Sequence, residues 1–314
     1  PFSQPTVTSP QTTTTMPTTL LAGGSGLIGT RLAELLRAKG HTVRLLSRKP
    51  KGPDQFGWNT EKGTMDEAAL QGVDYVVNLA GAGIADQRWT ESRKREIIES
   101  RVQSARLLRD TLMRTGLRPK AYLSASAIGY YGNSGERRMN EADTPVGDSF
   151  MVQCCQVWEQ AADEVAALGI RTVKFRIGVV LAKEGGALPE FIKPLRFGLG
   201  TYFADGQAWY SWIHRNDLCR AFVWAIENEA IAGVFNAVAP QPERLKTLVE
   251  ATAEAMDKKA LIMPVPAFAL RLALGEMSAV VLNSNLVVAD KIQAAGFVFE
   301  YPKLPTALQQ IFNK

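Results

Sequence analysis

The chain has 314 residues, of which 46% are hydrophobic and 21% charged, and its formal net charge is +5. This length allows one large or two modest domains with an ordinary globular core. Because basic and acidic residues are interleaved, no basic tract or aromatic–basic stripe indicates a nucleic-acid partner, and the positive surplus suits an anionic ligand at least as well.

Cysteine and histidine are scarce. The three cysteines, Cys154, Cys155 and Cys219, are too few and wrongly spaced for a disulfide framework, and with only His41 and His214 they cannot build a zinc site. We therefore expect a metal-free protein of a reducing, cytoplasmic compartment. No stretch approaches the roughly 20 apolar residues of a membrane helix, so we expect no membrane association.

The first 15 residues, PFSQPTVTSPQTTTT, are polar and rich in Pro and Thr. They lack the cationic start and apolar centre of a signal peptide. We expect residues 1–17 to form a disordered extension, with Met16 as a candidate native start.

Short apolar runs then alternate with helical patterns as far as residue 181. The expected strands are 20–22, 41–46, 73–81, 120–126 and 171–181, and the expected helices are 27–38, 91–113 and about 152–167. This alternation predicts an α/β fold over residues 18–181, a Rossmann-like doubly wound parallel sheet covered by helices on both faces.

Beyond residue 181 the pattern changes to segments interrupted by Gly and Pro. Helices are expected at about 216–228, 245–256 and 268–274. We assign residues 182–314 mainly to a smaller C-terminal substrate region that is intertwined with the first part and has no clear linker.

The turn after the first strand contains three glycines spaced three apart. Gly23 permits a tight turn, Gly26 lets the backbone approach a pyrophosphate, and Gly29 lets the helix pack close to the sheet. The free N–H groups at the helix start suit phosphates; the alternative is a tight structural turn. The predicted cofactor-binding residues here are Gly23, Ser25, Gly26, Leu27 and Ile28.

The end of the second strand indicates which dinucleotide fits. An NAD site requires a carboxylate there for the ribose 2′-hydroxyl, whereas this chain has Arg48 and Lys49. Two cations favour a 2′-phosphate, and hence NADP(H); the alternative is a solvated basic turn. Trp58, near the next short strand, lies either beside the adenine or in the core.

The third strand ends in NLAG, and its small residues suit a backbone lying under the adenine ribose. We therefore add Leu79, Ala80 and Gly81 to the predicted cofactor site. Arg88 and Trp89 follow in the next loop, where a cation beside an aromatic ring suits an anionic or planar substrate. A simple surface pair is the alternative for Arg88.

The motifs GGSGLIGTRL, NLAG and LSASAIGYYG resemble those of the extended short-chain dehydrogenase/reductase superfamily. RWTESRKREIIESR, WIHRNDL and the C-terminal tail are similar to its epimerase-like subfamily of atypical members, which ends in a domain of unknown function. The resemblance covers residues 18–314. It implies a Rossmann fold, an NADP(H)-type cofactor, and oxidoreduction or epimerisation of an unidentified small-molecule substrate.

The resemblance breaks at the catalytic residues. In the superfamily a Ser polarises the reacting oxygen, a Tyr exchanges the proton, and a Lys four residues later lowers the pKa of that Tyr. Ser126 matches the Ser. The other two positions fall near Met151 and Cys155, which carry neither an exchangeable phenol proton nor a fixed positive charge.

Two hypotheses remain for the activity. In one, a tyrosine that leaves the same strand end supplies the proton; Tyr130 and Tyr131 are the candidates, and we name Tyr130 with Ser126 as catalytic. In the other, the protein binds NADP(H) without catalysis and acts as a regulator, because no Lys depresses the pKa of a Tyr.

Two segments of the C-terminal part carry further candidates. Trp212 and His214, in WYSWIHRNDL, are assigned to the substrate side of the crevice. The alternative is that Asn216 or Asp217 caps the following helix and His214 is structural. The second segment, EGGALPEFIKPLRFG, contributes Lys193 and Arg196, either as a wall of an acidic-ligand pocket or as solvated helix charges.

Overall fold

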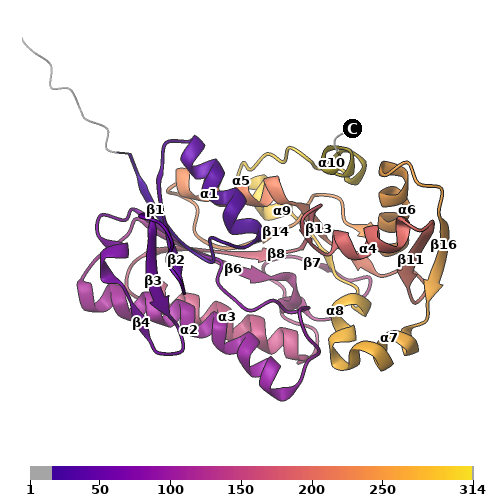
Figure 1. The fold of residues 1–314 in the computed structure, drawn as a ribbon, viewed down its shortest axis with the longest axis horizontal. Helices are drawn as coiled ribbons and strands as arrows, with labels where there is room; N and C mark the ends of the chain where they lie inside the picture. Colours follow the sequence, from indigo (N-terminus) through magenta and orange to yellow (C-terminus); the bar gives the residue numbers. More distant parts are fainter. Residues whose placement is uncertain (1–15, 313–314) are drawn as a thin grey trace, which may run out of the picture.

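The structure is a computed structural model that describes residues 16–312. The extension expected at residues 1–17 falls, apart from Met16 and Pro17, outside the described residues. Figure 1 shows a larger lobe built around one sheet and a smaller lobe that contains most of the C-terminal part.

The larger lobe contains an eight-stranded sheet in the order β14-β8-β6-β5-β1-β2-β3-β4. The strands are β1 (Thr18–Ala22), β2 (Thr42–Ser47), β3 (Gln55–Asn59), β4 (Thr64–Met65), β5 (Tyr75–Asn78), β6 (Ala121–Ala127), β8 (Arg171–Ile177) and β14 (Gly233–Ala237). Every neighbouring pair is parallel except β3 and β4. The predicted doubly wound α/β architecture is confirmed.

Helices cover both faces of this sheet (Figure 1). On one face α1 (Leu27–Ala38) packs beside α5 (Arg215–Glu227), and on the other α2 (Glu91–Thr115) packs beside α3 (Phe150–Ala166). Leu32 and Leu36 of α1 are fully buried in one apolar cluster against the sheet, and Leu108 of α2 is fully buried in another. Each helix therefore buries one apolar stripe against the sheet, as its spacing predicts.

The strand expected over 171–181 is divided at Gly178. β8 stays in the large sheet, while β9 (Val179–Ala182) pairs with β10 (Gly185–Gly186) and β13 (Trp212–His214) in a second sheet. A Cβ at Gly178 would lie 2.3 Å from the Ser211 carbonyl oxygen. Only glycine permits this approach, and it occurs where the chain passes from one sheet to the other.

The smaller lobe packs α4 (Leu188–Leu195), α6 (Leu245–Ala255) and α10 (Leu304–Ile311) around a separate core that contains Trp212. The remaining elements that the structure describes are β7 (Arg138–Met139), β11 (Leu199–Phe203), β12 (Trp209–Tyr210), β15 (Glu243–Arg244), β16 (Leu261–Val265), β17 (Leu286–Val287), α7 (Ala267–Leu274), α8 (Ala279–Leu282), α9 (Asp290–Ala294) and three 3-10 turns, η1 (Glu67–Leu70), η2 (Ile128–Tyr131) and η3 (Gly275–Ser278). Because α5 and β14 join the larger lobe, residues beyond 181 also build the sheet domain.

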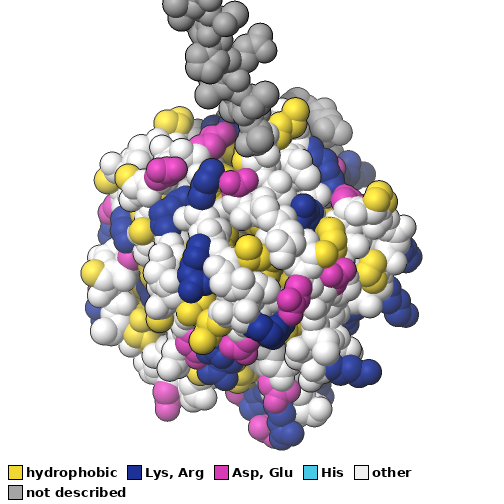
Figure 2. All heavy atoms as spheres, turned by 90° about the vertical axis from the view of Figure 1, so that its left-hand side faces the viewer, with side chains coloured by type: hydrophobic (Ala, Val, Ile, Leu, Met, Phe, Trp, Pro, Cys, Tyr) yellow, Lys and Arg dark blue, Asp and Glu magenta, His cyan; other side chains and the backbone are white. Residues whose placement is uncertain are grey.

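Charge is mixed on the face of the larger lobe shown in Figure 2, where Lys and Arg side chains alternate with Asp and Glu and form no continuous basic patch. Within residues 16–312, no helix combines the length and apolar character needed to cross a bilayer.

Candidate functional site

The glycine turn between β1 and α1 is built by close backbone contacts. Gly23 has φ +79°, and a Cβ there would lie 2.8 Å from the carbonyl carbon of Leu79. A Cβ at Gly29 would lie 2.3 Å from the Gly23 oxygen. A Cβ at Gly26 would have only the Gly23 oxygen near it, at 3.4 Å, and Gly26 is exposed. The outer glycines therefore close the turn, while the middle one leaves open space above the backbone.

The N-terminus of α1 opens onto that space. Gly26 is the N-cap and supplies no side-chain cap, and the first turn of the helix has no acidic residue. Ser25 is exposed, and Leu27 and Ile28 are half-buried. Unshielded N–H groups and the positive end of the helix dipole suit a diphosphate here, so the turn fits the group that its sequence predicts.

Arg48 and Lys49 lie directly after β2, the parallel neighbour of β1. Both side chains are exposed, and within the described residues neither makes a hydrogen bond or ion pair. The Lys49 N–H donates to Ser47 Oγ at 3.2 Å, which shapes the turn. Two unpaired cations therefore stand one strand away from the glycine turn.

A buried asparagine fixes the loop after β5. Asn78 is fully buried; its Nδ2 donates to Ser104 Oγ at 3.1 Å and to Tyr122 Oη at 3.0 Å, and its Oδ1 accepts from the Ala80 N–H at 3.1 Å. The Leu79 N–H donates to the Ala22 oxygen at 2.9 Å. These bonds hold residues 79–81 beside the glycine turn.

Ser126, at the end of β6, is enclosed. Its side chain is 1% exposed, and its Oγ donates to Glu159 Oε1 of α3 at 2.8 Å. Glu159 also accepts two hydrogen bonds from Arg176 of β8, at 2.8 and 3.0 Å. The hydroxyl is thus part of a buried ionic network that the sequence did not predict.

The two candidate tyrosines of η2 have different environments. Tyr131 is fully buried; its Oη donates to Asn236 Oδ1 at 2.7 Å and accepts from Arg176 Nη1 at 3.0 Å. Burial raises the pKa of Tyr131 to about 12, so this phenol is a poor proton donor near neutral pH. Tyr130 is half-buried with its ring 3.4 Å from Arg176 Cζ, and its hydroxyl has no partner among residues 16–312.

Met151 and Cys155 of α3 lie beside η2, which directly follows β6. From a Cβ at Gly129 in η2, Met151 Cε would lie at 3.1 Å and Cys155 Sγ at 3.6 Å. Burial raises the pKa of the Cys155 thiol. Met151 has no proton to exchange, and a thiol at Cys155 carries no fixed positive charge, so neither side chain replaces the Tyr or the Lys that the resemblance implies.

One charged residue beside this site was missed. Arg101 of α2 is 9% exposed, and its Nη1 donates to the oxygens of Ala82 and Ile97, at 3.0 and 2.8 Å. Its position carries a signal, because 97, 101, 105 and 108 follow one another at helical spacing on the buried face. A cation within a buried apolar stripe is rare unless it has a partner, so Arg101 is a candidate for ligand binding.

The proposed substrate residues are dispersed. Arg88 is exposed, and its Nη2 donates to the Leu272 oxygen at 3.3 Å, linking the loop after β5 to α7. Trp212 has no exposed surface, and its Nε1 donates to the Gln241 oxygen at 2.9 Å. This enclosure removes Trp212 from the substrate surface and makes it a packing residue of the smaller lobe.

His214 is a structural residue that caps α5 itself, a role that the alternative interpretation gave to Asn216 or Asp217. Its Nδ1 accepts from the Asn216 N–H at 3.2 Å, and its Nε2 lies 2.8 Å from Gln310 Oε1. Asp217 instead accepts from the N–H groups of Glu300 and Tyr301, each at 2.8 Å. Both side chains therefore anchor the C-terminal segment, and His214 does not face a crevice.

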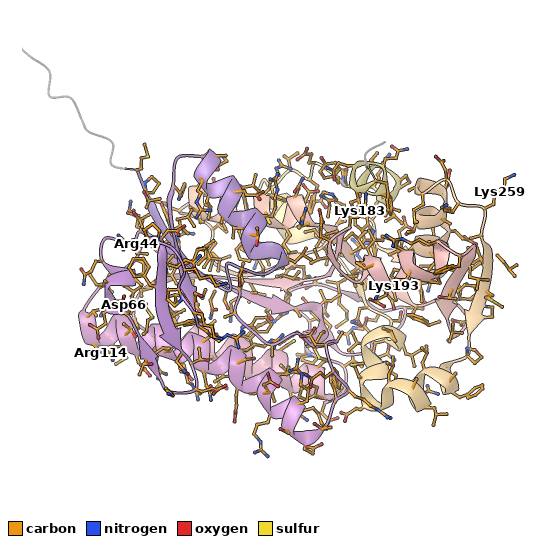
Figure 3. The ribbon with its side chains drawn as sticks, in the orientation of Figure 1. Arg44, Asp66, Arg114, Lys183, Lys193 and Lys259 are labelled. Carbon is orange, nitrogen blue, oxygen red and sulfur yellow. The ribbon has the colours of Figure 1, made fainter. Side chains whose placement is uncertain are left out.

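A cavity of about 350 Å³ in the smaller lobe is lined in part by three cations: Lys183, Lys193 of α4, and Arg196, which directly follows α4. Lys193 pairs with Glu190 at 2.6 Å. Figure 3 shows Lys183 and Lys193 in this lobe, apart from Arg44 on the sheet side. The acidic-ligand wall stays a prediction, since Lys193 is exposed and already paired, as expected for a solvated helix charge.

Two family models match the chain. The model of the NAD dependent epimerase/dehydratase family matches residues 19–237, and that of a domain of unknown function (DUF1731) matches residues 265–311. Epimerase family protein SAR0825 of Staphylococcus aureus is 36% identical over 302 residues, covering 94% of this chain and 99% of its own. Epimerase family protein YfhF of Bacillus subtilis is 35% identical and covers 93% and 96%.

Solved structures agree with this match. The human epimerase family protein SDR39U1, crystallised with NADPH, has 31% identity and a TM-score of 0.85, with 95% of this chain and 99% of that chain covered. UDP-N-acetylglucosamine 4-epimerase of Bacillus cereus has 18% identity, a TM-score of 0.75, and coverage of 95% and 98%; at this identity the likeness concerns the fold.

Proposed function

The chain belongs to the NAD-dependent epimerase/dehydratase family, and from this premise we propose that it is an NADP(H)-dependent oxidoreductase or epimerase-like enzyme. Its substrate would be a small hydroxyl or carbonyl compound. The chain does not have the Tyr and Lys that the superfamily resemblance predicts, so its proton chemistry must differ.

The pair of free cations after β2 carries the choice of cofactor. A carboxylate there would favour a ribose 2′-hydroxyl, whereas Arg48 and Lys49 suit a 2′-phosphate. Their side chains are exposed and have no partner among residues 16–312, so binding a phosphate would not require them to break an existing ion pair. The NADPH in the structure of the human relative supports the same choice.

The rest of the dinucleotide site would follow the C-terminal edge of the sheet. The open backbone at Gly26 and the uncapped start of α1 would hold the diphosphate. Residues 79–81, fixed by Asn78, would lie under a ribose.

Bound NADP(H) would supply or accept a hydride, and the protein would provide the path for the proton. Tyr130 has the free phenol at the strand end, so it is the group we propose to exchange that proton. Ser126 Oγ donates to Glu159 Oε1 in this structure, so its O–H would have to turn from Glu159 to the reacting oxygen in order to polarise it. Ser126 would then hold the reacting oxygen from the enclosed side, while the less enclosed Tyr130 would exchange the proton.

A second candidate is a non-catalytic NADP(H)-binding regulator. It is favoured by the enclosure of Ser126, by the high pKa of Tyr131, and by Met151 and Cys155 at the positions of the missing dyad. In this case the C-terminal part would contact a partner protein according to the redox state of the nucleotide.

The first experiment is to identify the nucleotide that copurifies, by absorbance and mass spectrometry, and then to titrate the emptied protein with NADPH and NADH. Tight binding of NADPH with clear preference over NADH supports the proposal. Binding of neither nucleotide would overturn it, because the glycine turn would then be a structural turn or hold another ligand.

A further inference from the structure

Arg101 is a buried cation without a carboxylate partner. It lies on α2 at 9% exposure, and no Asp or Glu of residues 16–312 forms an ion pair with it. Other buried arginines of the chain are paired, Arg93 with Glu96 at 2.7 Å and Arg176 with Glu159 at 2.8 Å. An unpaired guanidinium in the interior is costly, so its retention calls for a compensating contact.

The guanidinium is placed at the end of β5. A Cβ at Gly81 would lie 3.0 Å from Arg101 Cζ, so the side chain packs directly against this residue. On its other side Arg101 Cζ lies 4.8 Å from the Trp158 ring of α3. The thiols of Cys154 and Cys155 also lie near it, and burial lowers the pKa of the guanidinium.

Arg101 also retains hydrogen-bonding capacity. Only Nη1 has partners in the part of the chain that the structure describes, the oxygens of Ala82 and Ile97. Nε and Nη2 have no partner in that part of the chain, yet neither atom is fully enclosed. The donors of this cation thus remain available beside residues 79–82.

Sheet order indicates which end of the dinucleotide lies there. The neighbours run β2, β1, β5, β6. Arg48 and Lys49 at the end of β2 would hold the adenosine 2′-phosphate, and the turn after β1 would hold the diphosphate. Because residues 79–81 would lie under the adenine ribose, the nicotinamide half must continue past the end of β5 toward β6, where Arg101 and Cys155 lie.

We infer that Arg101 binds the ribose and phosphate oxygens of the nicotinamide half of NADP(H). Arg101 would then provide the positive charge that a Lys supplies elsewhere in the superfamily and that Cys155 does not supply here. The inference rests on the proposed function, since it requires that the chain bind NADP(H). The planar guanidinium can donate to adjacent oxygens while Nη1 still holds Ala82.

Arg101 could instead act only by supporting the loop after β5, because its Nη1 contacts Ala82. The experiment must distinguish this support from contact with the nucleotide. The test therefore uses two ligands: NADPH, and 2′,5′-ADP, which has the adenosine 2′-phosphate but no nicotinamide half. Binding is measured by calorimetry for the full chain and for Arg101→Met, Arg101→Lys and Arg106→Met. Arg106 lies on the same helix but is half-exposed and paired with Glu164, so its variant is the matched control.

Arg101→Met should weaken NADPH by roughly tenfold or more and leave 2′,5′-ADP within about twofold, because only one half of the cofactor loses a charge-assisted contact. Arg101→Lys should keep an intermediate affinity, and Arg106→Met should match the native chain. Without nucleotide, Arg101→Met loses the Nη1 bonds to Ala82 and Ile97 together with an unpaired buried charge, so its melting temperature is measured separately and the affinities are compared where every variant is folded.

Equal weakening of both ligands would overturn the inference and make Arg101 a loop support. Unchanged NADPH affinity in Arg101→Met would overturn it as well. If Arg101→Met does not fold, unchanged affinity in Arg101→Lys would overturn the contact of the planar guanidinium with adjacent oxygens. Failure of the native chain to bind NADPH is a different result, because it rejects the proposed function itself.

Discussion

Glu159 of α3 and Arg176 of β8 form an enclosed ion pair with two hydrogen bonds, at 2.8 and 3.0 Å, and both side chains are less than 10% exposed. The pair joins Ser126 on one side to Tyr131 on the other. The residues at the end of β6 are therefore fixed by a charge network below them.

Glu159→Gln should destabilise the fold by about 3–5 kcal/mol, because it leaves the buried Arg176 without its counter-charge. Urea unfolding of the native chain and the variant measures the difference. Glu190→Gln, which breaks the exposed pair with Lys193, should change stability far less. Similar losses in the two variants would show that the enclosed pair has no special contribution.

The cofactor preference depends on the end of β2. Arg48→Asp combined with Lys49→Ala should weaken NADPH by about 100-fold, the loss of two charge-assisted contacts, and NADH by only a few-fold. Fluorescence titration with both nucleotides measures the ratio. Lys62→Ala, in the exposed turn between β3 and β4, is the control and should change neither affinity. An equal loss for the two nucleotides would contradict binding of the 2′-phosphate.

Ser126→Ala separates the enzyme from the regulator. If the protein is an enzyme, turnover in a substrate screen should fall by roughly a hundredfold while NADPH affinity stays the same. Ser124→Ala is the matched control, since Ser124 is buried two residues earlier and donates to the Ala125 oxygen. For a regulator, neither variant affects any chemistry, and partner binding changes when NADPH replaces NADP⁺.

The two tyrosines should respond in opposite ways. Tyr131→Phe removes the bonds to Asn236 and Arg176 and should cost about 1–3 kcal/mol of stability, because two buried polar groups lose a partner. Tyr130→Phe should leave the melting temperature almost unchanged but abolish proton exchange with the substrate. The prediction fails if Tyr130→Phe retains full turnover at saturating substrate.

Local sequence patterns predicted the frame of the larger lobe well. The helix expected at 27–38 has those bounds in α1, because its apolar stripe and flanking glycines are read from adjacent residues. The partners of Ser126 were not predictable in this way. Glu159 and Arg176 are 33 and 50 positions away and meet Ser126 only after the sheet and α3 have packed.

The same limit explains the errors in the smaller lobe. Trp212 and His214 are polar-tipped aromatic residues in a motif with functional character, yet their partners are Gln241 and Gln310. Sequence spacing does not predict these distant contacts. Arg101, by contrast, lies on the apolar face of a predicted helix, and that local conflict was visible in the sequence.

Both histidines of the chain should make the fold acid-sensitive. Burial is the largest influence on each, and it lowers the pKa of His41 and of His214 below the ordinary 6.5. The unfolded chain then binds protons more readily than the folded chain, so the stabilisation is fully present above pH 6.5 and is lost as the pH falls through the lowered values. Protonation of His214 Nδ1 would also remove the acceptor that caps α5.

Melting temperatures at about pH 7.5 and about pH 5.5 measure this loss. A double variant, His41→Gln with His214→Asn, should flatten the difference, because Asn can still accept the capping bond and neither new side chain titrates. Asp74, whose pKa is lowered, titrates below this window and should not contribute to the slope. If the double variant kept the whole pH dependence, other groups would be responsible for the acid sensitivity.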